Sequence, residues 1–231
     1  MKYPVILKYL MPDGSTAAQM VRISGGTFLR VDENGEPVSE VEVSDFTMGR
    51  YVVTFEQYDR FAKSTDRKLP GACGWGRGNR PIMKISWHDA MAYTQWLSEK
   101  AGENFRLPTE AEWEYACRAG TKTDYSFGVN ITEEQVNFNR VENKTMPVGS
   151  YQPNSFGLYE MHGNVWEWCA DWYDEYPSGK VRDPKGPDTG EMRVLRGGSW
   201  FVNAWYTRSF SRACDGPGER DHSRGFRLAG N

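Results

Sequence analysis

The last forty or so residues of the chain hold its most varied chemistry, arranged as two interleaved layers. One layer is regular, rich in arginine and glycine, and occupies residues 193–200, 208–209, 212 and 225–229. The other fills the gaps with aromatic, aliphatic, acidic, imidazole and thiol groups that follow neither a helical nor a strand period. Such a mixture suits an exposed recognition surface, where side chains are chosen for a partner and not for packing. An ordinary C-terminal loop is the alternative, and this pattern alone does not decide between the two.

The regular layer predicts a scaffold for that surface. It contains five arginines, whose planar guanidinium groups can each donate several hydrogen bonds to loop carbonyls and carboxylates. These are Arg193, Arg196, Arg208, Arg212 and Arg227. A solvated basic face is the alternative, but the geometry of the guanidinium favours loop pinning. We expect Trp200 and Phe226 to anchor the two ends of the segment in the core, and Gly197 and Gly198 to form turns closed to other residues.

Composition and charge exclude several kinds of partner. The 231 residues include 28 basic and 31 acidic side chains, for a formal net charge of −3, and no basic run occurs. A nucleic-acid partner therefore has no electrostatic footprint. No apolar stretch approaches the roughly 18 residues that a membrane span needs. We expect no nucleic-acid partner, no membrane span, and a monomer.

The cysteines and histidines predict no metal site by their spacing. The four cysteines are far apart and form no C-x-x-C pair, so zinc is not expected. Cys117 and Cys169 stand in apolar contexts and are expected to be buried thiols. Of the three histidines, His88 is expected at the surface or its boundary, and His162 as a structural histidine with satisfied hydrogen bonds.

Helix-start signals and short apolar runs predict an α+β domain. Thr54, Ser86 and Thr109 can each cap a helix and pair with a polar residue three positions on, although Asp89 is short for that role. Gly102 and Gly120 would end the second and third helices, which we expect to be the longer two. Short strands are expected at residues 5–9, 20–23, 27–31, 41–43, 46–53 and 193–195.

Long glycine- and proline-bearing loops fill much of the rest, as at residues 70–81 and 173–190, and loops of this length are commonly functional or pinned by a ligand. No repeat or break in composition marks a linker. We therefore expect residues 1–231 to form a single domain, with an N-terminal strand extension over 1–24 and a variable region over 193–229.

Six motifs in series resemble the formylglycine-generating-enzyme (sulfatase-modifying factor) family. They are Arg-Pro-Ile at 80–82, Ser-Trp-His-Asp-Ala at 86–90, Arg-Leu-Pro-Thr-Glu-Ala-Glu-Trp-Glu-Tyr-Ala at 106–116, Gly-Leu-Tyr-Glu-Met at 157–161, Gly-Asn-Val-Trp-Glu-Trp at 163–168 and Arg-Gly-Gly-Ser-Trp at 196–200. The resemblance covers residues 25–229 and implies a C-type-lectin-like α+β fold of this family's subtype, with little regular secondary structure.

The resemblance also shows what catalysis would need. Oxidases of the family hold copper with two cysteines five positions apart, just after Gly-Gly-Ser, and paired thiolates suit Cu(I). Here those positions are Val202 and Thr207, of which one has no donor and the other is a poor ligand for this ion. A second enzymatic branch uses a three-histidine iron site, which this chain lacks. We expect no enzymatic activity and no catalytic cofactor; an altered or degenerate oxidase is the alternative.

The alternation within residues 193–229 resembles the variable proteins of diversity-generating retroelements, of the Treponema variable protein type. In that group selected codons, commonly those of asparagine, are rewritten between two fixed frames, Arg-Val-Leu-Arg-Gly-Gly-Ser-Trp and Gly-Phe-Arg-Leu-Ala, and this chain has both. The resemblance implies a non-enzymatic protein that binds an unknown macromolecular ligand, a protein or another cell-surface molecule. It also implies export to the cell surface, after removal of a leader.

Fourteen positions between the frames are expected to vary, to contact the ligand and to be largely exposed on one face. They are Phe201, Val202, Asn203, Trp205, Tyr206, Ser211, Ala213, Cys214, Asp215, Gly216, Glu219, Asp221, His222 and Ser223. Phe201, Trp205 and Tyr206 are expected to form an apolar patch. Because a rewritten asparagine codon cannot encode Trp or Glu, variation at Trp205 and Glu219 would require other template codons.

The resemblance of residues 163–168 and their surroundings to the formylglycine-generating-enzyme family also implies a structural calcium ion. It would be bound by three backbone carbonyls and one carboxylate. The ligands would be Glu160, Gly163, Val165 and Glu167. For Glu167, a buried carboxylate paired with an arginine is the alternative. A platform for sugar is a further possibility, but packing in the core is favoured. Its aromatic residues would be Trp166, Trp168, Trp172 and Tyr173.

Overall fold

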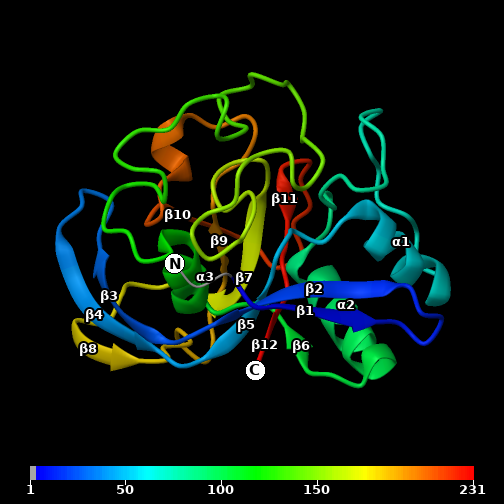
Figure 1. Ribbon diagram of the computed structural model, residues 1–231, viewed down its shortest axis with the longest axis horizontal. Helices are drawn as coiled ribbons and strands as arrows, with labels where there is room; N and C mark the ends of the chain where they lie inside the picture. The colour runs from blue at the N-terminus through cyan, green and yellow to red at the C-terminus, as the bar shows by residue number, and fades with distance from the viewer. Residues whose placement is uncertain (1–3) are drawn as a thin grey trace.

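The computed structural model describes residues 4–231 and is shown in Figure 1. Its three α-helices begin where the capping signals predict them. They are α1 (Phe55–Ser64), α2 (Trp87–Ala101) and α3 (Glu110–Arg118). Thr54, Ser86 and Thr109 each accept a hydrogen bond from the third amide of the helix, and the side chain at that third position accepts one from the backbone of the cap. Asp89 makes this reciprocal bond despite its short side chain.

The helix ends differ in part from the prediction. Gly102 ends α2 in the left-handed conformation, at φ 69°. The third helix ends one residue earlier than expected, because Ala119 takes the left-handed conformation at φ 46°. With 9 residues, α3 is shorter than α1, which has 10, so the expectation that the third helix is one of the longer two was wrong.

Twelve strands form three sheets within the described residues. The five-stranded sheet has the order β1 (Ile6–Leu10), β2 (Thr16–Ile23), β5 (Phe46–Gly49), β12 (Ala229–Gly230) and β6 (Phe105–Arg106). The three-stranded sheet, at the left of Figure 1, has the order β3 (Gly26–Val31), β4 (Pro37–Val43) and β8 (Gly179–Arg182). The four-stranded sheet has the order β10 (Arg212–Asp215), β9 (Arg193–Arg196), β7 (Trp166–Trp172) and β11 (Arg224–Gly225).

The expected strands are all present, but one is cut short. The run predicted over 46–53 stops at Gly49, because Arg50 and Val53 donate to separate partners, the carbonyls of Gln19 and Phe226. Strands β6 to β8 and β10 to β12 were not predicted. Most of them have only two to four residues and exist through pairing with distant segments, as when Ala229 pairs with both Met48 and Arg106.

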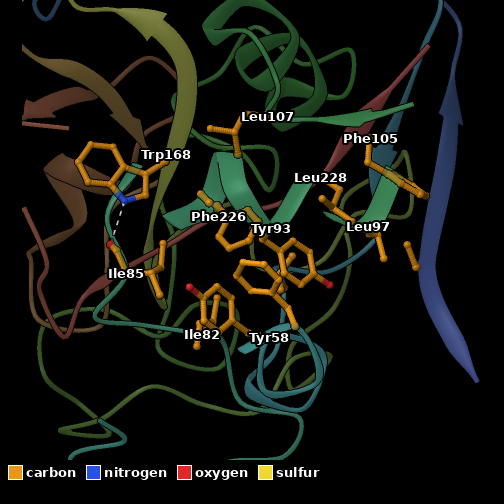
Figure 2. Close-up of a cluster of buried hydrophobic side chains, with 14 of the residues drawn as sticks. Tyr58, Ile82, Ile85, Tyr93, Leu97, Phe105, Leu107, Trp168, Phe226 and Leu228 are labelled. Carbon is orange, nitrogen blue, oxygen red and sulfur yellow. Dashed lines mark hydrogen bonds between the residues drawn. The ribbon is translucent and has the colours of Figure 1, made fainter. Parts of the chain in front are cut away.

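The core lies between these sheets and the helices. Phe226 is fully buried and meets Tyr93 of α2 edge to face, with ring centroids 5.4 Å apart. Figure 2 shows Phe226 and Tyr93 among the buried side chains of this cluster, with the indole of Trp168 donating to the carbonyl of Ile85. Trp166 and Trp168 are both buried, which confirms for these two rings that they pack in the core and do not form a sugar platform.

Candidate binding surface

The C-terminal segment is held from beneath by Arg196, whose side chain has no exposed surface. Its Nη1 donates to the carbonyls of Phe210 (3.1 Å) and Ser211 (2.9 Å). Its Nη2 donates to the carbonyl of Ser209 (2.8 Å) and to the carboxylate of Glu114 (2.8 Å). Three successive peptide groups of the predicted variable region are therefore fixed by a single guanidinium.

The carboxylate of Glu114 is the counterion for this arrangement and is itself fully buried. Burial alone would raise its pKa, but the guanidinium groups of Arg196, Arg118 and Arg30 lower that pKa below its ordinary value. Glu114 therefore stays ionised at neutral pH, and its carboxylate neutralises the charge of the buried Arg196 guanidinium.

Three further arginines pin the same segment. Arg212 forms a two-pronged ion pair with Glu110 (3.0 and 2.8 Å) and donates to the carbonyl of Asp174 (2.7 Å). Arg208 donates to the carbonyl of Glu33 at 3.1 Å, which ties the segment to the β3–β4 turn. The guanidinium of Arg193 lies between the rings of Trp87 and Trp172 and donates to the carbonyl of Ala170.

The fifth arginine, Arg227, forms a buried ion pair with Glu167. Its Nε and Nη2 donate to the two carboxylate oxygens of Glu167 at 2.6 and 2.7 Å, and Trp113 donates to one of those oxygens at 2.7 Å. Arg227 also donates to the carbonyls of Gly49 and Tyr159. All five arginines thus make structural hydrogen bonds. This confirms that they pin loops and do not form a solvated basic face.

One of the residues expected to hold calcium already has another partner. Glu167 was to supply the carboxylate, but its negative charge is already balanced by Arg227, as the alternative interpretation states. The side chain of Glu160 is buried and accepts from the Gly149 amide at 2.9 Å, and burial raises its pKa to about 7. A divalent ion bound through the Glu167 carboxylate would have to displace Arg227.

The ends of the segment are anchored as predicted. Trp200 and Phe226 are both buried. Gly197 and Gly198 have φ values of 93° and 75°, in the left-handed region that favours glycine. A Cβ on Gly198 would lie 2.5 Å from the Cγ2 of Thr207, so no larger residue fits there.

The predicted variable positions separate into three groups by exposure. The exposed group contains Asn203, Trp205, Tyr206 and Glu219. The half-buried group contains Phe201, Val202, Ala213, Cys214, Asp215, Gly216, Asp221 and His222. The buried group contains Ser211 and Ser223. Exposure is thus confirmed for four positions and is only partial for eight.

For Ser211 and Ser223 the expected exposure was wrong, because each serine completes the frame. The hydroxyl of Ser211 donates to the carbonyl of Trp205 at 2.6 Å. The amide of Ser223 donates to the carboxylate of Asp221 at 2.9 Å, and its carbonyl accepts from Trp166 at the start of β7. The sequence predicts a short polar side chain in this segment to be variable surface. Such a side chain can equally form hydrogen bonds with backbone groups of a buried turn.

The most exposed side chains lie on a short 3₁₀ helix, η1 (Ala204–Thr207). Trp205 and Tyr206 expose 54% and 48% of their surfaces. The side chain of Asn203 caps this helix by accepting from the Trp205 amide at 3.1 Å. Arg208 lies 3.4 Å from the centroid of the Trp205 ring and so supports its inner face. Two aromatic rings are therefore presented to solvent on a fixed backbone.

Phe201, the third residue of the expected apolar patch, is half-buried and stacks on His222 with centroids 5.9 Å apart. Both rings contact Trp200, which in turn meets Trp75 at 5.2 Å. The sequence did not single out Trp75. Its only signal was the length of the loop over 70–81, which was expected to be functional or pinned.

The positions that hold copper cysteines in the oxidases are occupied by side chains that serve packing. Val202 packs against the buried cluster that contains Phe226 and Tyr93, and the buried Thr207 donates to the carbonyl of Ala204 at 2.9 Å. The ring of His162 lies 2.7 Å from the Thr207 carbonyl and accepts from the Ser126 amide, and burial lowers its pKa to about 4. His162 is therefore a neutral structural histidine, as predicted.

The thiols of the described residues do not combine into a reactive or metal-binding group. All four cysteines are free. Cys117 and Cys169 are buried, as predicted, and burial raises the pKa of Cys117 to about 12, which keeps its thiol neutral. Across residues 4–231, no three His, Cys, Asp or Glu side chains converge as metal ligands would.

The sheet arrangement, the low helix content and the pinned C-terminal segment define a C-type-lectin-like domain of the formylglycine-generating-enzyme type. Residues 8–231 match the sulfatase-modifying factor enzyme 1-like domain, and the chain belongs to this family. The formylglycine-generating enzyme of Streptomyces coelicolor is 40% identical over 288 aligned residues, which cover 93% of this chain and 90% of that enzyme.

Two solved structures superpose on nearly the whole chain. Treponema denticola variable protein 1 has a TM-score of 0.83 at 29% identity, covering 98% of this chain and 99% of that one. PvdO from Pseudomonas aeruginosa also has a TM-score of 0.83, at 30% identity, covering 99% of both chains. The resemblances to the enzyme family and to a Treponema variable protein, and the predicted fold, are confirmed.

Proposed function

We propose that this protein is a non-enzymatic binder whose C-terminal surface, diversified by a retroelement, recognises a macromolecular ligand such as a protein or another cell-surface molecule. One observation carries the proposal. The backbone of the segment is held by buried residues of the regular layer, above all Arg196, while Trp205 and Tyr206 point into solvent. Side chains at such positions can change without loss of the frame, which is what a diversified surface requires.

The chemistry at the positions of the oxidase cysteines supports the non-enzymatic part. Val202 and Thr207 offer no soft donor for Cu(I), and Cys117, the thiol near His162, is a neutral buried group. The decisive assay incubates the purified protein with copper, oxygen and a cysteine-containing sulfatase peptide, beside the Streptomyces coelicolor enzyme as a positive control. We expect no formylglycine product; turnover at a rate like that of the control would establish the alternative, an altered oxidase.

A diversified binding surface must tolerate substitution, and this tolerance is tested by randomising positions and selecting for folded protein. A library varied at Asn203, Trp205, Tyr206 and Glu219 should yield mostly folded variants, whereas a matched library at Ser199, Ser209, Ser211 and Ser223 should yield few. Equal yields would remove the two-layer basis of the proposal. In the genome, a reverse transcriptase gene beside a near-copy of the last codons, differing at adenines, would support diversification directly.

Export to the cell surface is part of the same proposal, because a diversified binder gains most from meeting foreign partners. No helix of residues 4–231 combines the length and apolar character needed to cross a bilayer. Fractionation of cells that make the full-length precursor tests the proposal. Recovery at the cell surface is expected, and a purely cytosolic product would refute it.

A further inference from the structure

Strand β10 forms one edge of the four-stranded sheet and lies inside the predicted variable region. It pairs antiparallel with β9 over all four of its residues, from Arg212 opposite Arg196 to Asp215 opposite Arg193. Within the described part of the chain, its backbone makes no ladder with any strand on its other side. In an antiparallel pair, every second residue directs both its N–H and its C=O away from the partner strand. Two residues of β10 therefore present backbone donors and acceptors outward.

The side chains of β10 leave this edge open to a second strand. Edges are commonly protected by an outward charge or a proline. In β10 the one basic residue, Arg212, is turned onto Glu110 in an ion pair, and Asp215 is paired with Arg224. The two central residues, Ala213 and Cys214, are small and uncharged.

Most other sheet edges of the described chain carry an exposed charge or are too short. The exception is the edge strand β3, whose one charged residue, Arg30, is buried, but β3 lies outside the predicted variable region. Strand β1 carries Lys8 at its centre, and β8 carries Lys180 and Arg182, both largely exposed. Strands β6 and β11 have only two residues each. Among the edges that belong to the predicted variable region, β10 is thus the one long enough to extend a sheet and free of a protecting charge.

Exposed apolar side chains border the edge, where they could receive the side chains of an added strand. On the face that carries Arg212 and Cys214, the ring of Tyr173 lies over the Arg212 guanidinium and the sulfur of Met192 lies 3.4 Å from that of Cys214. Tyr173 and Met192 expose 40% and 46% of their surfaces. At the start of β10, Ser211 is bonded to the carbonyl of Trp205, which places η1 beside the edge.

We propose that the ligand is a protein that offers an extended peptide segment, and that this segment adds to β10 as a further antiparallel or parallel strand. The inference rests on the proposed binding function and specifies its ligand class. Main-chain hydrogen bonds supply affinity in strand addition, while the alternate side chains supply specificity. A diversified surface gains from this division, because the backbone of β10 stays the same while Ala213, Cys214 and Asp215 change.

The probe is a phage library of random linear 12-residue peptides, panned on the purified protein. A selected peptide is then synthesised with single N-methylated amides along its length. Peptides methylated at odd and at even positions have the same composition and serve as matched controls for each other. We expect one set to bind at least tenfold more weakly than the unmodified peptide and the other to bind nearly as well, because only alternate amides face the edge. Uniform tolerance of methylation would overturn the inference.

Amide hydrogen exchange provides a second measurement on the protein itself. Peptide binding should protect the two outward amides among residues 212–215 at least tenfold, and should leave β1 and β3 unchanged. Protection that instead rises with protein concentration alone would show pairing of two copies and would also overturn the inference.

The proposed function can stand when strand addition fails. Selected peptides, or a folded protein ligand from cell-surface extracts, could lose binding on Trp205→Ala without protecting β10. That outcome would leave the binding role intact and refute the extended-peptide ligand. A library that yields no binder would count against the peptide ligand in the same way.

Discussion

Replacing Arg196 with methionine should destabilise the fold far more than replacing any exposed residue of the surface above it. The substitution removes donors from the carbonyls of Ser209, Phe210 and Ser211 and one counterion from Glu114, all in a buried setting. Each carbonyl left without a donor costs about 1 kcal/mol or more. Loss of one partner from a buried ion pair costs roughly 3–5 kcal/mol, and here it is reduced because Glu114 keeps Arg118. We therefore expect the free energy of unfolding to fall by about 4–5 kcal/mol.

Urea unfolding followed by the fluorescence of the nine tryptophans measures this loss. Arg196→Lys keeps the charge but loses the planar donor geometry, so it should cost roughly half as much. The matched surface control, Tyr206→Ala, should change stability by no more than about 0.5 kcal/mol. If Arg196→Met and Tyr206→Ala had similar effects, the segment would not depend on the buried guanidinium, and the two-layer interpretation would be refuted.

Three further predictions concern the core, pH and metal. Phe226→Ala should cost about 3–5 kcal/mol in the same assay, because the ring is fully buried, and a loss below about 1 kcal/mol would contradict its anchoring role. Burial raises the pKa of Glu160 to about 7, so the folded chain binds a proton that the unfolded chain releases between about pH 4.5 and 7. Stability should therefore decline as pH rises through that window, and Glu160→Gln should lessen the decline between about pH 4.5 and 7. The part of the decline that is due to Asp171, whose pKa burial also raises to about 7, should remain. An identical decline in variant and parent would refute this. Finally, EGTA should leave the unfolding temperature unchanged, because Arg227 already neutralises Glu167; a fall on chelation that calcium reverses would show a bound ion.

The sequence by itself predicted the features that depend on local chemistry. A hydroxyl followed three residues later by a polar side chain located the start of each helix, because both hydrogen bonds of the cap form within one turn. Short apolar runs located the strands near the N-terminus, because this signal too lies within the segment itself. Five arginines of residues 193–229 could be identified as structural, since a guanidinium among glycines and loop residues suits carbonyl pinning.

The exposure of single residues in the same segment could not be predicted. Ser211 and Ser223 look like surface residues, but the carbonyl of Trp205 and the carboxylate of Asp221 bond to them inside the fold. Trp75 belongs to the C-terminal aromatic cluster, but its only sequence signal was the length of its loop, because its partner Trp200 is more than a hundred residues away. These contacts depend on how distant segments are brought together.

The sequence therefore determined the family and the helix starts, and it predicted a division of the C-terminus into a frame layer and a variable layer. Only the tertiary structure decided which of the predicted variable positions reach solvent, and that Glu167 pairs with Arg227. Strand β10 shows the physical reason most clearly. Its four residues have no strand signal of their own, and they become a sheet edge because β9, held by the buried Arg196, offers a ladder to pair with.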